Sequence, residues 1–529
     1  MTAGPASAAP LDRRLAILLA MAMFVLVVDT SFMNVSISAV VADLDTTVSG
    51  VQSAIALEAL VSAAFILIGS KVGDLVGRKR AYVLGLLAYA TGAVAMMLAQ
   101  SLTAVIIFWA IVGGLGASLL LPSMQSLIHG NFSGGAQVKV YALVGASASI
   151  AAAVGPLLGG FITTYLSWRV AFGLEALIIL VVLSGIRLVK DVRFTGDRSI
   201  DVVGAGLSAL AMGGIVLAIL VWQEGGEAVG ALIAVGGVAL AALVWWLLRR
   251  KRQGRPVLLD PDLFRLPLFR VGVSQQTLQQ ITLGAAMITL PIFLQMVLEY
   301  DAMAAGLSLA PLSLSMFAMA LLAGKRSGRR RPATIVLVGF ALVVLGVLVL
   351  LPVVPRATSG WYLVLPLLVV GSGLGLLVSQ LNNYTLSPIT EERVSEAAGV
   401  NSAAGSFGLS FGLAFAGGIM LAALSLGFTS QADASTVLSA QEQAQVATAL
   451  EDDAELMSNT ALEETLAGQP PEVQAEILRI NTEVRPRALQ IALLVPLLAG
   501  VVGLVNGFRM RRLPDPQPNA AVEGASLGG

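Results

Sequence analysis

Long apolar segments, separated by short polar or charged turns, make up most of this 529-residue chain. Each segment reaches about 20 residues, the length at which an α-helix crosses the hydrocarbon core of a bilayer. The pattern predicts roughly 14 such helices, with ends placed to within a few residues. The expected spans are 15–38, 49–69, 81–99, 102–124, 141–164, 171–189, 203–221, 229–248, 272–298, 303–323, 333–352, 361–385, 397–427 and 488–508. We therefore expect an all-α, polytopic membrane protein.

The amino-acid composition agrees with this interpretation and excludes several kinds of chemistry. Hydrophobic residues make up 57% of the chain and charged residues 12%, whereas soluble domains carry about 25% charged residues. Cysteine is absent, which excludes disulfides and thiolate chemistry. The sequence shows no Walker A pattern and no metal-ligand cluster. We expect no enzymatic activity, no cofactor, no nucleic-acid partner and no direct use of ATP.

The basic residues are distributed unequally between the two ends of the predicted helices. If the N-terminus is cytoplasmic, most of the 32 lysines and arginines fall on the cytoplasmic side. Those on the other side are Arg169, Arg356, Arg479, Arg485 and Arg487. Cytoplasmic loops of membrane proteins carry the excess of basic residues. We therefore predict a multi-pass protein of the cytoplasmic membrane with both termini in the cytoplasm.

Two charged connections, 186–201 and 249–270, divide the spans into groups. They flank two spans that we interpret as a linker pair, with six spans on either side. Two six-helix halves around a site at the bilayer midplane are typical of secondary carriers. The predicted parts are a cytoplasmic N-terminus (1–14), an N-terminal six-helix half (15–189), connections with two linker spans (190–271), a C-terminal six-helix half (272–508) and a cytoplasmic tail (509–529).

The segment 428–487, inside the second half, differs from the rest of the chain because it is polar and acidic. Val473, Ile477 and Ile480 follow helical spacing, and Pro471 suits the first turn of a helix. We interpret the segment as a small extracytoplasmic helical loop. The alternative is a disordered acidic loop.

Three acidic residues lie within predicted spans: Asp29 in the first, Glu58 in the second and Glu175 in the sixth. Carboxylates in a bilayer are costly, and they usually face a cavity and carry function. A site that is anionic when empty and neutral when protonated can exchange protons for a cation. The alternatives are a packing hydrogen bond from Asp29 to Asn34, and contact of Glu175 with outer water or with Arg169.

Other polar and aromatic residues within the spans are candidates for lining a substrate cavity. They are Asn34, Trp109, Gln276, Gln280, Asn382 and Asn401. The alternative for the amides is hydrogen bonding between packed helices. The alternative for Trp109 is contact with lipid or a neighbouring helix.

Two short motifs suggest parts that move. The turn between the second and third spans contains Gly73-Asp74, Gly77 and Arg78-Lys79. The fifth span contains Gly155-Pro156, followed by Gly159-Gly160. Small residues let helices approach closely, and proline bends a helix. We expect Asp74, Gly77, Arg78, Gly155, Pro156 and Gly159 to govern conformational switching; the alternative for the second motif is a purely structural kink.

These motifs resemble the signature loop and the antiporter motif of the major facilitator superfamily. Asp29-Thr30 with Asn34-Val35 is similar to the D-x-T-x-x-N-V pattern of its 14-span drug:proton antiporter family, quaternary-ammonium type. The resemblance covers essentially the whole chain. It departs from the family in the fourth span, where Ala110 stands at a position usually occupied by an arginine implicated in proton coupling.

The resemblance implies a secondary active transporter that exports hydrophobic, cationic drugs or toxic compounds in exchange for protons, and so contributes to multidrug and antibiotic resistance. Its expected partners are small-molecule substrates, protons and the lipid bilayer, and it is expected to work as a monomer. One alternative is a dedicated exporter of an endogenous metabolite, peptide or lipid. Another is a membrane receptor or scaffold that does not transport.

Overall fold

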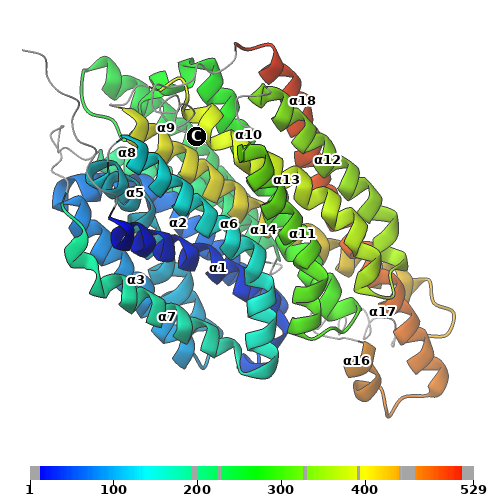
Figure 1. Cartoon of the computed structure of the whole chain (residues 1–529). Coiled ribbons are helices and arrows are strands. Elements are labelled where there is room, and N and C mark those ends of the chain that lie inside the picture. The colour runs from blue at the N-terminus through cyan, green and yellow to red at the C-terminus, as the bar shows by residue number, and fades with distance from the viewer. Residues whose placement is uncertain are drawn as a thin grey trace, which may run out of the picture.

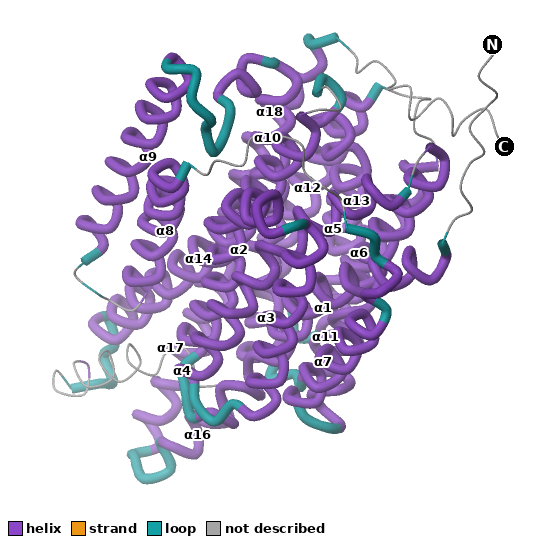
Figure 2. Tube along the Cα trace, turned by 90° about the vertical axis from the view of Figure 1, so that its left-hand side faces the viewer, coloured by secondary structure: helices purple, strands orange, loops and turns teal. Residues whose placement is uncertain are grey.

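The computed structural model describes residues 12–132, 134–191, 201–223, 226, 228–325, 331–389, 393–439, 443 and 459–514. All regular elements in these ranges are helices (Figure 2). Among them, 14 helical spans are long and apolar enough to cross a membrane. The expectation of an all-α polytopic membrane protein is confirmed.

Six spans form the N-terminal half, drawn from blue to cyan in Figure 1. Its elements are α1 (Arg13–Leu44), α2 (Val48–Val76), α3 (Arg78–Leu98), α4 (Leu102–Ala104), η1 (Val105–Gly113), α5 (Gly114–Asn131), α6 (Gly134–Tyr165), α7 (Trp168–Ser184) and η2 (Ile186–Leu188). The linker pair is α8 (Val202–Gln223) and α9 (Val229–Arg252), followed by η3 (Pro261–Arg265). α8 packs against α2 and α14, while α9 lies outside α8 at the edge of the bundle (Figure 2).

Six further spans form the C-terminal half. Its elements are α10 (Pro267–Ile292), η4 (Phe293–Val297), α11 (Ala302–Lys325), α12 (Pro332–Val353), η5 (Val354–Arg356), η6 (Gly360–Leu363), α13 (Val364–Leu386), α14 (Val394–Asp433), α16 (Asn459–Thr465), α17 (Pro471–Ala492) and α18 (Leu494–Arg511). α16 and the start of α17 project from one end of the bundle (Figure 1). We call this end the outer face, and the end with Gly77 and Gly254 the inner face.

The structure differs from the sequence expectation at three places. The fourth span is divided by the π-helical η1, which hydropathy cannot reveal because an extra residue per turn leaves composition unchanged. α14 continues to Asp433, beyond the expected end at 427. The helix expected from Pro471 onward is present as α17, but it leads directly into the last span, since only Leu493 separates α17 from α18. The acidic cluster Glu451-Asp452-Asp453 lies outside the described residues.

The two halves meet along two pairs of helices, α2 with α14 and α6 with α11. Glycines permit the closest approach in the second pair. A Cβ atom at Gly160 would lie 2.4 Å from the carbonyl oxygen of Ala302, and one at Gly306 would lie 2.3 Å from that of Pro156. Such distances are shorter than any van der Waals contact, so a larger side chain at either position would separate the two halves.

An ionic network joins the linker segment to α14 at the inner face. Asp260 accepts hydrogen bonds from Lys251 and from Arg393, the latter at 2.6 Å, and its backbone N–H donates to Glu396. Burial tends to raise the pKa of Asp260, but the hydrogen bond from Lys251 and the backbone N–H of Asp262 hold it below its usual value. The linker is therefore attached to the C-terminal half by an ionic network at the inner face.

Candidate functional site

Asp29 is the centre of a buried polar cluster in the N-terminal half. It lies on α1, and its side chain is 1% exposed. Its carboxylate accepts a hydrogen bond from the Tyr89 hydroxyl on α3 and one at 2.9 Å from Trp109 Nε1 on η1. The π-helical turn places Trp109 toward α1, where its ring also contacts Phe172 of α7 edge-on at 6.3 Å. Asp29 is thus held by donors from two other helices.

The structure brings Glu58 and Glu175 to the same cluster. Glu58 lies on α2 and Glu175 on α7, with 8% and 1% of their surfaces exposed. Both interact electrostatically with Asp29, and all three carboxyl groups act on Tyr89. Neither carboxyl oxygen of Glu175 has a hydrogen-bond partner among the described residues. The three acids, although distant in sequence, form one site.

No basic side chain of the described chain balances these carboxyl groups. The charged neighbours that act on Glu58 and Glu175 are acidic, and Ala110, beside Trp109, is fully buried. Three buried carboxylates without a cation repel one another in a medium of low dielectric constant. Such a cluster is electrostatically costly unless part of its charge is neutralised.

The other predicted cavity residues fall into two groups. Asn34 and Trp109 lie near the acids: Trp109 binds Asp29, while Asn34 donates to the Thr30 carbonyl at 2.8 Å and leaves its own Oδ1 without a partner. The packing hydrogen bond between Asp29 and Asn34 is not present among the described contacts. The Asn34 oxygen is a buried acceptor on the helix that carries Asp29.

The remaining amides lie in the C-terminal half. Gln276 and Gln280 face α14 beside Gly405 and Gly408. Asn401 on α14 donates to Asn382 on α13 at 3.2 Å. The structure shows no contact between these residues and the acidic cluster. They would complete a cavity only from the opposite half, as expected for a site at the interface of two halves.

The glycines of α6, the fifth span, allow two neighbouring helices to pack closely against it. A Cβ at Gly155 would lie 2.5 Å from the Ser31 side chain, and one at Gly159 would lie 2.7 Å from Val35, both on α1. The next glycine, Gly160, faces α11 across the halves instead. Pro156 lies between these contacts inside α6. The motif thus joins the helix carrying Asp29 to the interface between the halves.

The predicted switching turn connects α2 to α3 at the inner face. Gly77 has φ +103°, a conformation that side chains other than glycine rarely adopt. Arg78 begins α3, and the next residue, Lys79, donates from its backbone to Asp191 and from Nζ to the Val189 carbonyl. The turn is therefore tied to the segment that follows α7. The Asp74 side chain lies outside the described part of the structure.

Hydrogen bonds between the halves at the outer face were not foreseen from the sequence. Gln295 on η4 accepts from the backbone N–H and the hydroxyl of Ser38 on α1, at 3.1 and 2.7 Å. Thr164 on α6 accepts from the backbone of Met303 on α11 at 3.0 Å. Together with the glycine contacts of α6 and α11, these bonds hold the two halves together at the outer face. Gln295 is an isolated glutamine in an apolar segment, and the sequence pattern there does not predict a hydrogen bond to the other half.

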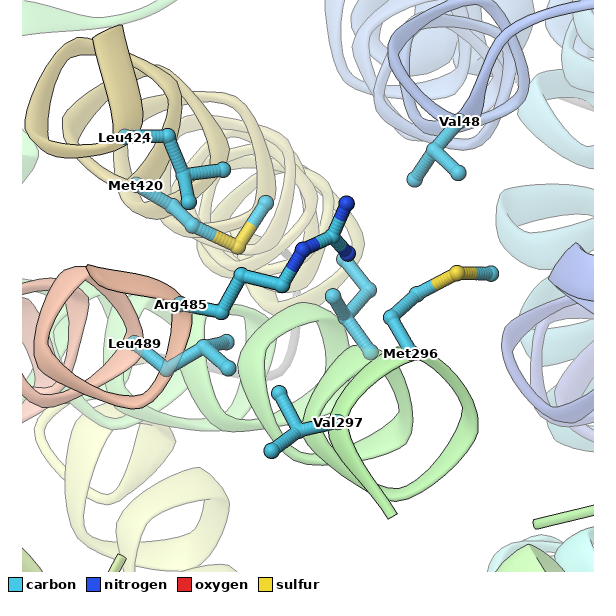
Figure 3. Close-up of a pocket in the computed structure, with 8 residues that line it drawn as sticks. Val48, Met296, Val297, Met420, Leu424, Arg485 and Leu489 are labelled. Carbon is cyan, nitrogen blue, oxygen red and sulfur yellow. The ribbon is translucent and has the colours of Figure 1, made fainter. Parts of the chain in front are cut away.

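Arg485 lines a small cavity at this end of the bundle. Its side chain extends from α17 between Met420 and Met296 toward Val48 on α2 (Figure 3). It is 5% exposed, and its Nε donates to Asn481 at 2.7 Å. The cavity, about 20 Å³, is just large enough for a water molecule. The charge pattern predicts Arg485 on the extracytoplasmic side of the membrane, whereas the structure buries it where the two halves meet.

Comparison with known proteins agrees with this geometry. Residues 19–202 and 198–413 match the sequence model of the Major Facilitator Superfamily. The "Probable actinorhodin transporter" of Streptomyces coelicolor is 25% identical over 415 residues, 77% of this chain and 72% of that protein. "Multidrug resistance protein Stp" of Mycobacterium tuberculosis is 26% identical, over 76% and 75%. "Puromycin resistance protein pur8" of Streptomyces alboniger is 27% identical, over 72% and 76%.

Solved structures share the fold. A bacterial homologue of the human lysosomal transporter Spinster, in an inward-facing and unoccupied conformation, superposes with a TM-score of 0.61. It is 11% identical, and the match covers 97% of this chain and all of that one. A D-xylose–proton symporter superposes with a TM-score of 0.56 at 12% identity, over 78% of this chain and 90% of that chain.

Proposed function

The chain belongs to the Major Facilitator Superfamily, and from this premise we propose that it exports hydrophobic, cationic compounds from the cell in exchange for protons. The observation that supports the proposal most directly is the buried cluster of Asp29, Glu58 and Glu175. In this account the carboxyl groups hold protons when no substrate is bound. A cationic substrate that enters the cavity takes the place of these protons.

The roles of the three acids follow from their surroundings. Asp29 is fixed by Tyr89 and Trp109 and serves as the positioned anion. Glu58 is the most exposed of the three and makes no hydrogen bond to a described residue, so it is the acid that a proton or cation reaches first. Trp109 and Phe172 are buried and packed edge-on beside Asp29, and we propose that their rings attract a hydrophobic cation when the site opens.

The names of the relatives support a small-molecule export function in this chain, since they include two drug-resistance proteins and a probable actinorhodin transporter. A second candidate is the dedicated export of one endogenous compound; the names of two relatives each specify a single compound, actinorhodin or puromycin. The two differ in breadth of substrate. Because all three acids belong to one chain, we propose that a single copy is sufficient for transport.

We further propose that the inner face is cytoplasmic. The inner face carries Arg249, Arg250, Lys251 and Arg252 at the end of α9, in agreement with the distribution of basic residues in cytoplasmic loops. The closed outer face, with its bonds from Ser38 and Thr164 to the C-terminal half, then corresponds to a state that is shut toward the outside.

This orientation predicts the result of single-cysteine labelling, for which the natural chain is suited because it contains no cysteine. Gln469→Cys, exposed at the outer face, should react in intact cells with a membrane-impermeant maleimide. Gln253→Cys, exposed at the inner face, should react only after the cells are opened. The reverse pattern would contradict the proposed orientation.

The bond between Ser38 and Gln295 should stabilise the closed outer face. We expect Gln295→Ala to favour opening by about 1 kcal/mol per hydrogen bond lost. A reporter cysteine at Val48, which is 1% exposed in the outer cavity, should then react several-fold faster from outside than in the chain that retains Gln295. The exposed Gln469→Cys serves as the control. If Val48→Cys reacted at the same rate with Gln295 and with Gln295→Ala, Gln295 would not contribute to closing the outer face.

Transport by purified protein in liposomes tests the proposed function. An imposed proton gradient should drive accumulation of ethidium or tetraphenylphosphonium, and dissipating the gradient should abolish it. A panel that includes neutral and anionic compounds of similar size separates the alternatives: uptake of one metabolite alone favours the dedicated exporter. Absence of any gradient-driven flux across the panel would favour a protein that does not transport.

A further inference from the structure

A basic groove lies at the inner face between α10 and α18, far along the chain from the acidic cluster. Its space is about 330 Å³, and its polar lining consists of Arg270 and Ser274 of α10 with Asn506 and Arg509 of α18. The other lining residues are apolar. Asn506 donates to the Ser274 hydroxyl at 2.9 Å, which joins the two helices across the groove.

The positive charge of this groove is not balanced. Arg270 and Arg509 are exposed, and neither has an ion pair among the described residues. The lining contains no acidic side chain. The first turn of α10 is also not capped by a side chain, so its backbone N–H groups add to the positive potential. Two arginines and the second N–H of the Asn506 amide are donors suited to a phosphate group, whereas the Ser274 hydroxyl donates to the Val271 carbonyl at 2.8 Å.

An apolar surface leads from the groove along α18 toward the middle of the membrane. Val505, Val502 and Leu498 lie four, seven and eleven residues before Arg509, and therefore on the same side of the helix. They are 54%, 52% and 63% exposed. If a ligand placed its phosphate at Arg509, its hydrocarbon chains would meet a continuous apolar surface that runs along α18 toward the middle of the membrane.

We propose that this groove binds an anionic phospholipid, with its phosphate between Arg270 and Arg509 and its acyl chains along Val505, Val502 and Leu498. Basic pockets between membrane helices at the headgroup level attract anionic lipids, at about 1 kcal/mol per arginine near the surface. The proposal does not depend on the transported substrate. It adds a lipid site in the C-terminal half, away from the cluster that exchanges protons.

Native mass spectrometry of delipidated protein tests the site, with dioleoyl phosphatidylglycerol and dioleoyl phosphatidylcholine as probes. The unaltered chain should retain phosphatidylglycerol on the order of tenfold more tightly than phosphatidylcholine. The double variant Arg270→Gln/Arg509→Gln should lose this preference. The control Arg511→Gln/Arg512→Gln removes the same charge from exposed positions outside the groove and should keep it.

Two further measurements show whether the charge of the groove and the acyl chains of the lipid both contribute to binding. Ser274→Asp introduces an acid into the groove and should weaken the binding of phosphatidylglycerol, as the double variant does. Glycerol 3-phosphate, which has the phosphate without acyl chains, should bind far more weakly than the lipid. Unchanged lipid preference in the Arg270/Arg509 double variant, an equal loss in the control, or equally tight binding of glycerol 3-phosphate would overturn the proposal.

Discussion

Replacing Asp29 with asparagine is expected to reduce proton-driven transport by roughly 10- to 100-fold, the effect of losing a buried charge-assisted hydrogen-bonding group. The substitution keeps the size of the side chain. It removes the negative charge, and it directs an amide N–H₂ group toward Tyr89 or Trp109, both of which donate to the carboxylate in the structure. The measurement is the initial rate of gradient-driven uptake in liposomes.

Asp45→Asn provides the matched control, because Asp45 ends the same helix and is exposed. Its backbone has φ +48°, a conformation that asparagine also tolerates. This variant should transport at the normal rate. If Asp29→Asn also transported normally, the cluster would have a structural role only, and the proposed exchange mechanism would lose its main residue.

Replacing Gly160 with leucine is the second substitution from which a large effect is expected. The new side chain cannot fit where a Cβ would already lie 2.4 Å from the Ala302 carbonyl. Overpacking of this kind costs about 1–3 kcal/mol, and it penalises only the state in which α6 and α11 touch. The closed outer face should therefore lose population by roughly 5- to 150-fold relative to the open one, and turnover should fall because the cycle needs both states.

Two measurements separate this effect from simple unfolding. In the Gly160→Leu protein, a cysteine at Val48 should become accessible from outside while ligand binding persists. Gly145→Leu, on the same helix, is the control, because a Cβ at Gly145 would have no heavy atom within 4 Å. Normal turnover by Gly160→Leu would show that the contact between α6 and α11 does not take part in the transport cycle.

The length of the apolar segments was sufficient to predict the 14 spans, because a helix needs about 20 apolar residues to cross a bilayer. The charged connections 186–201 and 249–270 indicated the division into halves. Segment length could not predict η1, since π-helical and α-helical turns have the same composition. It also placed the end of α14 too early, because residues 428–433 continue the helix into a more polar surrounding. Such ends depend on what the helix contacts outside the lipid.

Asp29, Glu58 and Glu175 were chosen as candidates because placing a carboxyl group in a membrane costs free energy. The residues that contact them were not predicted. Tyr89 is one of several tyrosines in apolar segments, and its contact with Asp29 spans 60 residues of sequence. Arg485 counted only as a charge outside the membrane, although it is buried between α17, α14 and α2. Interactions between helices depend on how the helices are rotated about their axes, which single-span patterns leave undetermined.

Proton release on substrate binding tests the exchange claim most directly. Purified protein in weakly buffered solution with a pH indicator receives a saturating dose of a cationic ligand such as tetraphenylphosphonium, and the protons released per bound ligand are counted. The account predicts release by the unaltered chain, less release by Glu58→Gln, and weaker binding by both Glu58→Gln and Asp29→Asn. Tight binding of the cation with no proton released across pH 5 to 9 would contradict it.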